Sequence, residues 1–531
     1  MDPKHLVLFL LLLFALCPAS LSSSEQTDAA ALLSLKKWVQ HDPAGVLQGW
    51  DSAQDLCYWH GVTCSYWRVT ELDLSRSGLV GILPASSLAS LDKLQVLNLS
   101  QNSFSGNASL LINLPLGLQQ LDLSVNQITG SIPAEFFTMH SKLSFLSLSH
   151  NNLTSLTVFS SDQLRILDLS FNNLSGAISE PDKFIACNSL VSLDMSSNFL
   201  VGHIPSLFSN CTALQTLNLS SNQLGDAIPR SLGELISLQR LDFSHNHLTG
   251  PIPPELGNTC QSLTVLQLSS NNISGSIPSS FSTCSVLQVL NLENNNISGL
   301  FPDSILGNLL SLESLLLSNN YISGPFPASI SSCKNLKVAD FSSNKLSGSL
   351  PRSICPGAAA LEELKLPDNL ITGRIPKTLA YCPKLKTIDL SLNFLKGRIP
   401  SELGRLNNLE RLMMWFNGLE GRIPPELGQC SKLKNLILNN NYLTGEIPQH
   451  LANCSNLEWI SLTSNEIRGR IPREFGRLGR LAILQLANNS LSEDIPQELG
   501  NCTSLLWLDL NSNNLSGDYS PAFGTSRGSC P

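Results

Sequence analysis

Leucine and asparagine recur along this chain at a nearly fixed spacing. Stretches of the form LxxLxLxxN, in which x is mostly polar, are 24 or 25 residues apart from Asn198 onward. Between Asn126 and Asn198 the spacing is 25, 21 and 26 residues. An earlier stretch with Leu72 and Leu74 has Ser77 in the asparagine position, so the pattern predicts nineteen copies of one unit. The asparagines are Asn102, Asn126, Asn151, Asn172, Asn198, Asn222, Asn246, Asn271, Asn295, Asn320, Asn344, Asn369, Asn393, Asn417, Asn441, Asn465, Asn489 and Asn513.

Each LxL segment alternates apolar and polar residues, which predicts a short strand with one buried face. Such a strand cannot bury its leucines alone, so neighbouring units must stack and share one core. Self-similarity at this period, with this pattern, is the signature of leucine-rich repeats. We therefore expect an α/β solenoid, a leucine-rich-repeat superhelix whose concave face carries a parallel β-sheet.

The asparagine comes where the chain turns off the strand. Its amide can donate to the carbonyl of one coil and accept from the N–H of another, satisfying backbone groups that the turn would otherwise bury unpaired. We interpret these asparagines as a structural ladder. Representative members are Asn102, Asn126, Asn222, Asn344, Asn417 and Asn513.

Most units continue after the asparagine as L-[ST]-G-x-I-P, for example from Leu248 to Pro253. Gly permits backbone angles that other residues avoid, and Pro fixes φ and ends the local hydrogen-bonding pattern. This segment resembles the plant-specific class of leucine-rich repeats. Ile-Pro is missing around Asn107, Thr154 and Ile178, so we expect local distortion of the solenoid in this region.

Residues 1–23 predict a secretory signal peptide. Lys4 and His5 precede an apolar run, Leu6–Leu16, and a short segment of small residues. The run is shorter than the roughly 20 apolar residues of a membrane span, and no such run follows. We expect the mature chain to be secreted into the apoplast or cell wall, or held at the plasma membrane if the gene continues into a receptor.

Twelve Asn-x-Ser/Thr sequons agree with secretion. Asn98 and Asn218 are expected to project from strands onto the concave face, where a glycan would obstruct a ligand. The sequons begin at Asn98, Asn107, Asn152, Asn173, Asn210, Asn218, Asn272, Asn296, Asn453, Asn488, Asn501 and Asn514.

Residues 24–66 do not repeat and predict an N-terminal cap. Asp28 is a plausible N-cap of a short helix with Leu32, Leu35 and Val39 along one side. The order ALLxLK, DPxGxLxxW and CxWxGVxC is similar to the cap of plant leucine-rich-repeat receptors. This resemblance implies a disulfide between Cys57 and Cys64, a means of closing an exposed first coil in an oxidising compartment.

Nine further cysteines lie eleven residues before the next ladder asparagine. Units without cysteine have leucine at this position, as at Leu91 and Leu235, so the site belongs to the core and buried thiols are favoured. Disulfides between adjacent coils, such as Cys187–Cys211, are the alternative. Cys355 is out of phase with the nine, which are Cys187, Cys211, Cys260, Cys284, Cys333, Cys382, Cys430, Cys454 and Cys502.

Charge and motifs argue against catalysis and nucleic-acid binding. The net charge is −8. P-loop, HExxH, G-x-S-x-G and kinase motifs are absent from the sequence. His245 and His247 share a loop but lack a third ligand at metal spacing. We expect no enzyme, no cofactor and no metal site.

The exposed positions of LxxLxLxxN can vary without disturbing the core, so we expect a binding surface to be formed by these residues. Six residues before each asparagine, the last units carry Arg411, Asn435, Trp459, Ile483 and Trp507. The tryptophans and isoleucine would form an apolar patch typical of a binding surface, although scattered surface aromatics are the alternative. Trp415 and Phe416 are expected to extend it.

A second stripe lies on the flank, where Arg374, Arg398, Arg422 and Arg470 follow the Gly of Gly-x-Ile-Pro. The segment from Ile371 onward holds 17 Lys and Arg against 14 Asp and Glu, and the rest of the chain holds 16 against 27. An arginine row could meet an acidic partner or an acidic wall polysaccharide, or could be simply solvated.

Three segments resemble the brassinosteroid-receptor-like kinases of plants, in particular their vascular branch. They are CPGAAALEELKLPDN (355–369), NLEWISLTSN (456–465) and LWLDLNSN (506–513). Members of that family continue with an island domain, a transmembrane helix and a kinase. Here the chain departs from the repeat at Tyr519 and Ser520 and stops at Pro531, so we expect repeats over residues 67–517 and a non-repeat tail over 518–531.

This resemblance implies the extracellular recognition module of a receptor-like protein, truncated before the island domain. Its partner would be a protein or a small extracellular ligand, and a co-receptor kinase ectodomain is a candidate. The alternative is a free secreted binder or inhibitor, similar to the polygalacturonase-inhibiting proteins.

Overall fold

The computed structural model of this chain describes residues 23–51, 54–155, 159–178, 184–355 and 360–516. The chain divides into two compact units, unit 1 (residues 1–223) and unit 2 (residues 224–531). The predicted signal peptide up to residue 22 and the predicted tail lie outside the described residues. The helices are α2 (Ser23–Trp38), α3 (Ala85–Leu88) and α4 (Glu135–Met139) in unit 1, and α5 (Asp303–Leu306) in unit 2.

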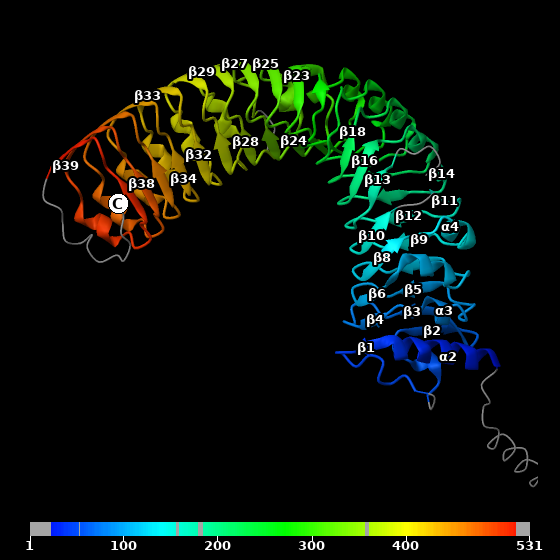
Figure 1. The fold of residues 1–531 in the computed structure, drawn as a ribbon. Helices are drawn as coiled ribbons and strands as arrows, with labels where there is room; N and C mark the ends of the chain where they lie inside the picture. The colour runs from blue at the N-terminus through cyan, green and yellow to red at the C-terminus, as the bar shows by residue number, and fades with distance from the viewer. Residues whose placement is uncertain (1–22, 52–53, 156–158, 179–183, 356–359, 517–531) are drawn as a thin grey trace, which may run out of the picture. The chain divides into compact units, whose positions relative to one another are not determined.

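The LxL segments of unit 1 form a long sheet (Figure 1). Its strands are parallel and in register from β3 onward, so that Leu72, Leu97 and Leu121 lie side by side. The first strand, β2, is antiparallel to β3 and belongs to the cap. The strands are β2 (Val62–Ser65), β3 (Arg68–Asp73), β5 (Val96–Asn98), β7 (Gln120–Asp122), β9 (Phe145–Ser147), β12 (Ile166–Asp168), β15 (Ser192–Asp194) and β17 (Thr216–Asn218).

Unit 2 contains a long parallel sheet of the same kind, which has more strands than that of unit 1. The middle residue of each strand from β19 to β38 is apolar and buried, as at Leu315 and Leu364, because the neighbouring coils cover it on both sides. Leu508 of β40, in the last described coil, is half-buried. The strands are β19 (Arg240–Asp242), β20 (Val265–Gln267), β22 (Val289–Asn291), β24 (Ser314–Leu316), β26 (Val338–Asp340), β28 (Glu363–Lys365), β30 (Thr387–Asp389), β32 (Arg411–Met413), β34 (Asn435–Ile437), β36 (Trp459–Ser461), β38 (Ile483–Gln485) and β40 (Trp507–Asp509).

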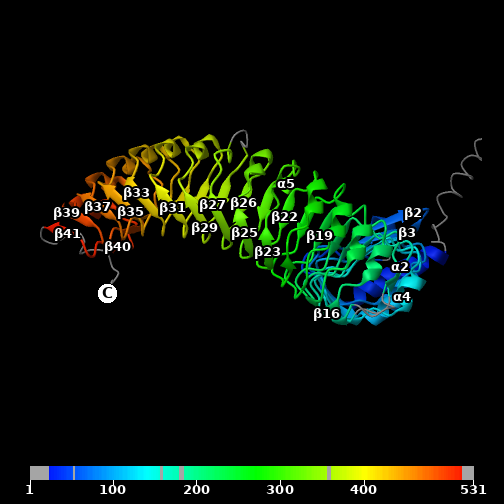
Figure 2. The ribbon, with the colours of Figure 1, turned by 90° about the horizontal axis from the view of Figure 1, so that it is seen from above.

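A second, lateral row of parallel strands follows the ladder asparagines of unit 2 (Figure 2). Each lateral strand pairs with the next one along the chain, and the Gly of the Gly-x-Ile-Pro segment, such as Gly373, has a positive φ at or next to the end of its strand. The strands are β21 (Ser274–Gly275), β23 (Asn296–Leu300), β25 (Tyr321–Pro325), β27 (Lys345–Ser349), β29 (Leu370–Gly373), β31 (Phe394–Gly397), β33 (Gly418–Arg422), β35 (Tyr442–Gly445), β37 (Glu466–Gly469), β39 (Ser490–Asp494) and β41 (Asn514–Ser516).

The lateral strands of unit 1 are interrupted where the repeat spacing is irregular. One parallel row ends at β10, and β13 starts another. Beside them β11 (Phe159–Ser160) pairs only with β14 (Phe184–Ala186) among the described strands. The expected local distortion is thereby confirmed near Thr154 and Ile178, but not around Asn107, where β6 pairs with both β4 and β8. The other strands are β1 (Val39–His41), β4 (Val80–Ile82), β6 (Ser103–Asn107), β8 (Gln127–Ser131), β10 (Asn152–Ser155), β13 (Ser175–Ala177) and β16 (Phe199–His203), with β18 (Gln223–Gly225) at the boundary of the units.

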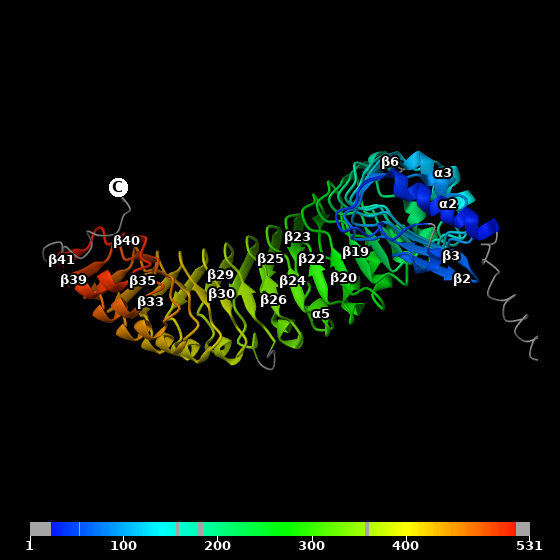
Figure 3. The ribbon, with the colours of Figure 1, turned by 90° about the horizontal axis from the view of Figure 1, so that it is seen from below.

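Short 3-10 turns complete most coils and line the edge of unit 2 that also holds α5 (Figure 3). From η3 onward each turn follows a Pro, in most coils that of Ile-Pro, whose fixed φ suits the start of such a turn. The turn η1 follows Asp55, and η2 follows Asn107. The turns are η1 (Leu56–Tyr58), η2 (Ala108–Asn113), η3 (Ser206–Asn210), η4 (Arg230–Glu234), η5 (Pro254–Thr259), η6 (Ser279–Thr283), η7 (Ala328–Ser332), η8 (Lys377–Tyr381), η9 (Ser401–Arg405), η10 (Pro425–Gln429), η11 (Gln449–Asn453), η12 (Arg473–Arg477) and η13 (Gln497–Asn501).

The ladder asparagines connect neighbouring coils. The amide nitrogen of Asn102 donates to the carbonyls of Leu74 in the preceding coil (2.8 Å) and of Leu99 in its own coil (3.0 Å). Its amide oxygen accepts the N–H of Leu79 (2.8 Å). Asn126 repeats the arrangement one coil later, donating to Leu99 and accepting from Phe104. Each asparagine therefore satisfies backbone groups of two coils at once.

The N-terminal cap is closed by a disulfide and a buried ion pair. Cys57 and Cys64 are bonded, with their Cα atoms 5.6 Å apart. The predicted helix N-cap at Asp28 is wrong, because α2 begins five residues earlier, at Ser23. The fully buried carboxylate of Asp28 instead accepts two hydrogen bonds from the guanidinium of Arg68 (2.9 and 3.0 Å) and one from the N–H of Val69.

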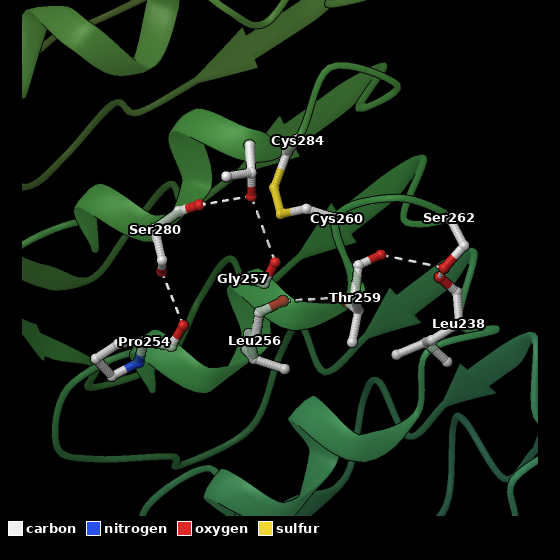
Figure 4. Close-up of a disulfide and its surroundings, with 10 residues drawn as sticks. Leu238, Pro254, Leu256, Gly257, Thr259, Cys260, Ser262, Ser280 and Cys284 are labelled. Atoms are coloured by element: carbon white, nitrogen blue, oxygen red, sulfur yellow. Dashed lines mark hydrogen bonds between the residues drawn. A yellow bond between two sulfur atoms is a disulfide. The ribbon is translucent and has the colours of Figure 1, made fainter.

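The prediction of buried thiols is wrong for five of the nine in-phase cysteines. Cys187 bonds Cys211, and Cys260 bonds Cys284 in the adjacent coil (Figure 4). The fifth, Cys382, bonds the out-of-phase Cys355. Stacked coils bring equivalent positions within bonding distance, with Cα separations of 4.8 Å for Cys187–Cys211 and 4.2 Å for Cys260–Cys284. The Cα atoms of Cys355 and Cys382 are 5.3 Å apart. The thiol prediction holds for Cys333, Cys430, Cys454 and Cys502, which are buried and free.

These free thiols should resist alkylation in the native protein. Burial raises the pKa of Cys333 and Cys430 to about 11, and burial with the nearby Cys430 raises that of Cys454 to about 12. Because the thiolate is the nucleophile, reactivity at pH 8 should be minimal and should rise only as the pH approaches 11. Mass spectrometry after iodoacetamide treatment checks this. In urea without reductant, Cys333, Cys430 and Cys454 should be labelled, whereas the disulfide-bonded Cys187 should not. Labelling of the three thiols in the native protein at pH 8 would contradict their assignment as buried.

Candidate binding surface

The column predicted from the sequence lies across five adjacent strands of unit 2. Arg411, Asn435, Trp459, Ile483 and Trp507 each occupy the first position of a strand, from β32 to β40, and pair one with the next. The residue after each faces the core, so these five side chains share the outer surface of the long sheet. The structure therefore places the predicted residues in one row.

The C-terminal end of this row is apolar and partly exposed. The side chain of Trp507 is 56% exposed, and the neighbouring Leu506 is 78% exposed. Trp459 is less exposed than expected, because it is half-buried and its indole N–H donates to Oε1 of Gln485 (3.1 Å). Ile483, between the two tryptophans, is also half-buried. Apolar contact area and an indole with a fixed orientation suit a partner with apolar side chains.

The other end of the row is polar and charged. Arg411 donates from Nε to Oγ1 of Thr387 (3.1 Å), and its guanidinium lies 3.5 Å from the carboxylate of Glu363. Lys365 bridges the same carboxylate (2.6 Å) and that of Asp340 (3.8 Å). The charges fix the side-chain positions at this end. The surface thus changes from a charged network to aromatic rings over five strands.

Trp415 and Phe416 lie at the turn after β32, beside the row. Their rings meet edge to face with centroids 6.3 Å apart, and Phe416 is 54% exposed. Phe416 adopts a positive φ of 56°, as do the residues that precede most other ladder asparagines. Its exposure therefore follows from the turn geometry, and the ring extends the apolar surface toward the turns.

A column of residues with alternating charge borders the row, and it was not among the predictions made from the sequence. Seven residues before successive ladder asparagines, Glu and Lys alternate from Glu313 to Glu458. Three ion pairs join neighbours, at 2.6–2.8 Å between Lys Nζ and the carboxylate. The hydrogen bond from Lys434 holds the pKa of Glu410 below its usual range. The alternation itself was a readable signal, because strands in register place these residues side by side. The pairs are Glu313–Lys337, Glu362–Lys386 and Glu410–Lys434.

The recurring aspartates of the long sheet have a local role. Their carboxylates accept the N–H of the residue two positions later and hold the turn that leads to the ladder asparagine. Such bonds are made by Asp73 to Ser75, Asp122 to Ser124 and Asp168 to Ser170, at 2.9–3.0 Å. Among the described residues, no group of three His, Cys, Asp or Glu side chains could hold a metal ion.

The two sequons expected on the sheet surface lie in unit 1. Asn98 ends β5 and Asn218 ends β17, and both side chains are half-exposed. Asn218 donates to the carboxylate of Asp194 (2.8 Å). The aromatic end of the row, in unit 2, has no sequon on its strands.

Family models match the cap and the repeats. A leucine rich repeat N-terminal domain matches residues 25–65. Leucine rich repeat models match eight further segments, three with one model and five with another. These are 188–248, 261–322 and 431–491, and 117–139, 163–182, 335–356, 384–406 and 408–430.

Solved structures of plant receptors share the fold over nearly the whole chain. The Arabidopsis receptor kinase HAESA, in complex with the peptide hormone IDA and the co-receptor SERK1, is 30% identical. The match covers 94% of this chain and 92% of that chain, with a TM-score of 0.71. The chain belongs to the plant leucine-rich-repeat receptor ectodomains. The plant peptide hormone receptor RGFR1, in complex with RGF2, is 31% identical over 88% of this ectodomain and 85% of that chain, with a TM-score of 0.71.

Several curated relatives are receptor kinases of the BRI1-like group, and others are different leucine-rich-repeat receptor-like kinases of plants. Serine/threonine-protein kinase BRI1-like 2 of Arabidopsis thaliana is 52% identical over 111 residues, 21% of this ectodomain and 10% of that protein. Receptor-like protein kinase BRI1-like 3 of the same plant is 40% identical over 217 residues, 38% of this ectodomain and 18% of that protein. The ectodomain thus matches less than a fifth of the length of either relative. Among the described residues, no helix combines the length and apolarity needed to cross a membrane.

Proposed function

We propose that the ectodomain binds an extracellular peptide or protein ligand on the long sheet of unit 2, between Arg411 and Trp507. The observation that carries this proposal is the row of side chains on β32–β40, charged at one end and aromatic at the other. An extended peptide can align charged groups with the Arg411 end and place apolar side chains against Trp507. The peptide-bound receptors HAESA and RGFR1 share the fold, which supports this class of ligand.

The same proposal includes a location outside the cell, which the disulfides and the sequons support. The inter-coil disulfides form and persist in oxidising compartments. The sequons and the predicted signal peptide have the same implication. A co-receptor ectodomain would approach the exposed aromatic end, where Leu506 and Trp507 leave apolar surface uncovered by the described residues.

Substitution of Trp507 tests the proposal. A panel of synthetic secreted peptides and receptor-kinase ectodomains is screened by biolayer interferometry against the full chain, and the binding partner found is then titrated. Trp507→Ser should weaken binding at least about tenfold, because large aromatic side chains dominate most interfaces.

The matched control is Trp67→Ser, since Trp67 is a similarly exposed tryptophan (64%) in the cap region of unit 1. It should leave the affinity unchanged within twofold. Equal losses for both variants, or no loss for Trp507→Ser, would place the ligand elsewhere on the ectodomain.

A further inference from the structure

Three consecutive coils of unit 2 concentrate positive charge on their lateral flank, and Glu402 of η9 follows directly after the third of them. The segments 345–354, 370–380 and 394–401 contain six Lys and Arg residues and no Asp or Glu, in a chain whose net charge is −8. The preceding segment, 321–330, is uncharged, and the following one mixes Glu420 with Arg422. We call this surface the basic flank. Its members are Lys345, Arg352, Arg374, Lys377, Lys396 and Arg398.

The backbone brings these cations together. The lateral strands β27, β29 and β31 are adjacent in the sheet (Figure 2), and Gly373 of β29 pairs with Leu395 of β31. The stem of Arg374 lies across the next coil, where a Cβ at Gly397 would come within 3.2 Å of its Cγ. Arg398 lies over Gly421 in the same way, at 2.9 Å. The glycines therefore leave room for arginine stems, which restricts where the guanidinium groups can lie.

The cations of the basic flank are not neutralised within the described part of the chain. None of the six forms an ion pair there, and Lys345 instead lies 4.9 Å from the ring centroid of Tyr321. Lysines of the long sheet behave differently, since Lys337, Lys386 and Lys434 each meet a glutamate. Strands roughly 4.8 Å apart hold the flank charges close enough to repel one another. Binding of an anion would relieve this repulsion.

A hollow between two of these coils offers hydroxyl groups beside the cations. Ser349, Arg352, Arg374, Lys377 and Thr378 are among the residues that line it. The Thr378 hydroxyl is buried and has no hydrogen-bond partner among the described residues. Hydroxyl and cationic groups together match a ligand that carries both carboxylates and hydroxyls.

Exposed aromatic rings accompany the cations. Phe394 is 57% exposed and precedes Lys396 by two residues in β31, so the two side chains share one face of the strand. Tyr321 lies on the other side, beneath Lys345. Flat aromatic faces next to charges accommodate sugar rings, whose C–H groups are apolar and whose edges are polar.

No glycan attached to these coils can cover the basic flank. The sequence contains no sequon between Asn296 and Asn453, whereas sequons recur on both sides of this interval. The longest interval without a sequon in the repeat region thus coincides with the region that concentrates unpaired cations.

We propose that the basic flank binds a linear polyuronate, an acidic wall polysaccharide with one carboxylate on each sugar ring. Such a chain repeats its charge at about the length of one ring, close to the roughly 4.8 Å spacing of the strands. It supplies carboxylates for the six cations, hydroxyls for the exposed Ser349, and ring faces for Phe394. An acidic peptide lacks this regular repeat and the ring faces. The site is separate from the row on the long sheet, so the ectodomain would hold wall polymer on one surface and a ligand on another.

The test is titration of the full chain with oligogalacturonates long enough to span three coils. The wild-type protein should bind them with an affinity that falls steeply as salt is added, because the contacts are charged. The triple variant Arg374→Gln/Lys396→Gln/Arg398→Gln should lose at least about tenfold in affinity and show a shallower salt dependence.

The matched control removes three exposed cations of unit 2 outside the basic flank. Lys384→Gln/Arg405→Gln/Arg477→Gln changes the net charge equally and should leave the affinity within twofold of wild type. Both variants should melt at the wild-type temperature. Equal loss in the two triple variants would show a non-specific charge effect and overturn the site.

Two further ligands decide the chemical class. Fully methyl-esterified oligogalacturonate should not bind, and equal binding of this neutral polymer would overturn the proposal. A polyglutamate peptide of equal charge should bind more weakly than the uronate, and tighter peptide binding would assign the basic flank to an acidic protein instead. The Trp507→Ser variant should bind oligogalacturonate with wild-type affinity. A wrong assignment of the basic flank can therefore be distinguished from a wrong assignment of the ligand site on the long sheet.

Discussion

Replacing Arg68 by alanine should lower the free energy of unfolding of the first coils by about 3–5 kcal/mol. The carboxylate of Asp28 is fully buried, and its charge is balanced by the two hydrogen bonds from Arg68. Removing the guanidinium leaves this charge in the interior with only the N–H of Val69. Because stability in a solenoid is transmitted between neighbours, the loss should appear first in β3 and β5. Urea unfolding with hydrogen exchange resolved by segment measures it.

Two companion variants separate this ion pair from surface charge. Lys93→Ala removes an exposed cation that lies 3.4 Å from Asp92, and should cost less than about 1 kcal/mol. Arg68→Lys retains the charge but cannot reproduce both hydrogen bonds, so an intermediate loss is expected. If Arg68→Ala unfolds at the wild-type urea concentration, the pair does not hold the cap on the repeats.

Replacing Asn344 by alanine should destabilise the surrounding coils of unit 2 by about 1–3 kcal/mol. Its amide nitrogen donates to the carbonyls of Leu317 (2.9 Å), Phe341 (3.2 Å) and Ser342 (3.1 Å), and its oxygen accepts the N–H of Ile322 (2.9 Å). Alanine leaves these buried groups without partners. The amide of Ile322 should exchange faster with solvent, which gives a readout specific to the lost bond.

Asn335→Ala is the matched control, because Asn335 donates a single exposed hydrogen bond to the carbonyl of Leu310. It should change stability by less than about 0.5 kcal/mol. Similar losses for both asparagines would mean that the ladder position has no special role.

Periodicity was sufficient to predict the repeat, the register of the long sheet and the place of the asparagines. A residue such as Leu364 must face the core because the alternation and the 24- or 25-residue spacing allow no other arrangement. The row from Arg411 to Trp507 followed from the same spacing, since equivalent positions on parallel strands become neighbours. Their role in binding stays a prediction.

Contacts between segments far apart in the sequence could not be predicted in this way. Asp28 is a residue type that is common at helix N-caps, which explains the wrong prediction. Its partner Arg68 lies 40 residues away, and no local sequence pattern connects the two. Cysteine and leucine alternate at one core position, so the pattern alone does not show which thiols meet. Cys355 pairs with Cys382 over 27 residues, a separation outside the regular repeat. The half-burial of Trp459, the first residue of β36, likewise involves Gln485, the third residue of the neighbouring strand β38.

The inter-coil disulfides also determine how the chain responds to proteolysis. Each of the pairs Cys187–Cys211, Cys260–Cys284 and Cys355–Cys382 closes a ring of one coil, so a single cut inside a ring leaves both fragments covalently joined. Between Cys430 and Cys502 the described cysteines are free, and a cut there is bridged by none of these rings. Fragments produced by a cut in the coils closed by these disulfides would therefore separate only after reduction, whereas no disulfide among the described residues joins the coils that carry Trp459 and Ile483.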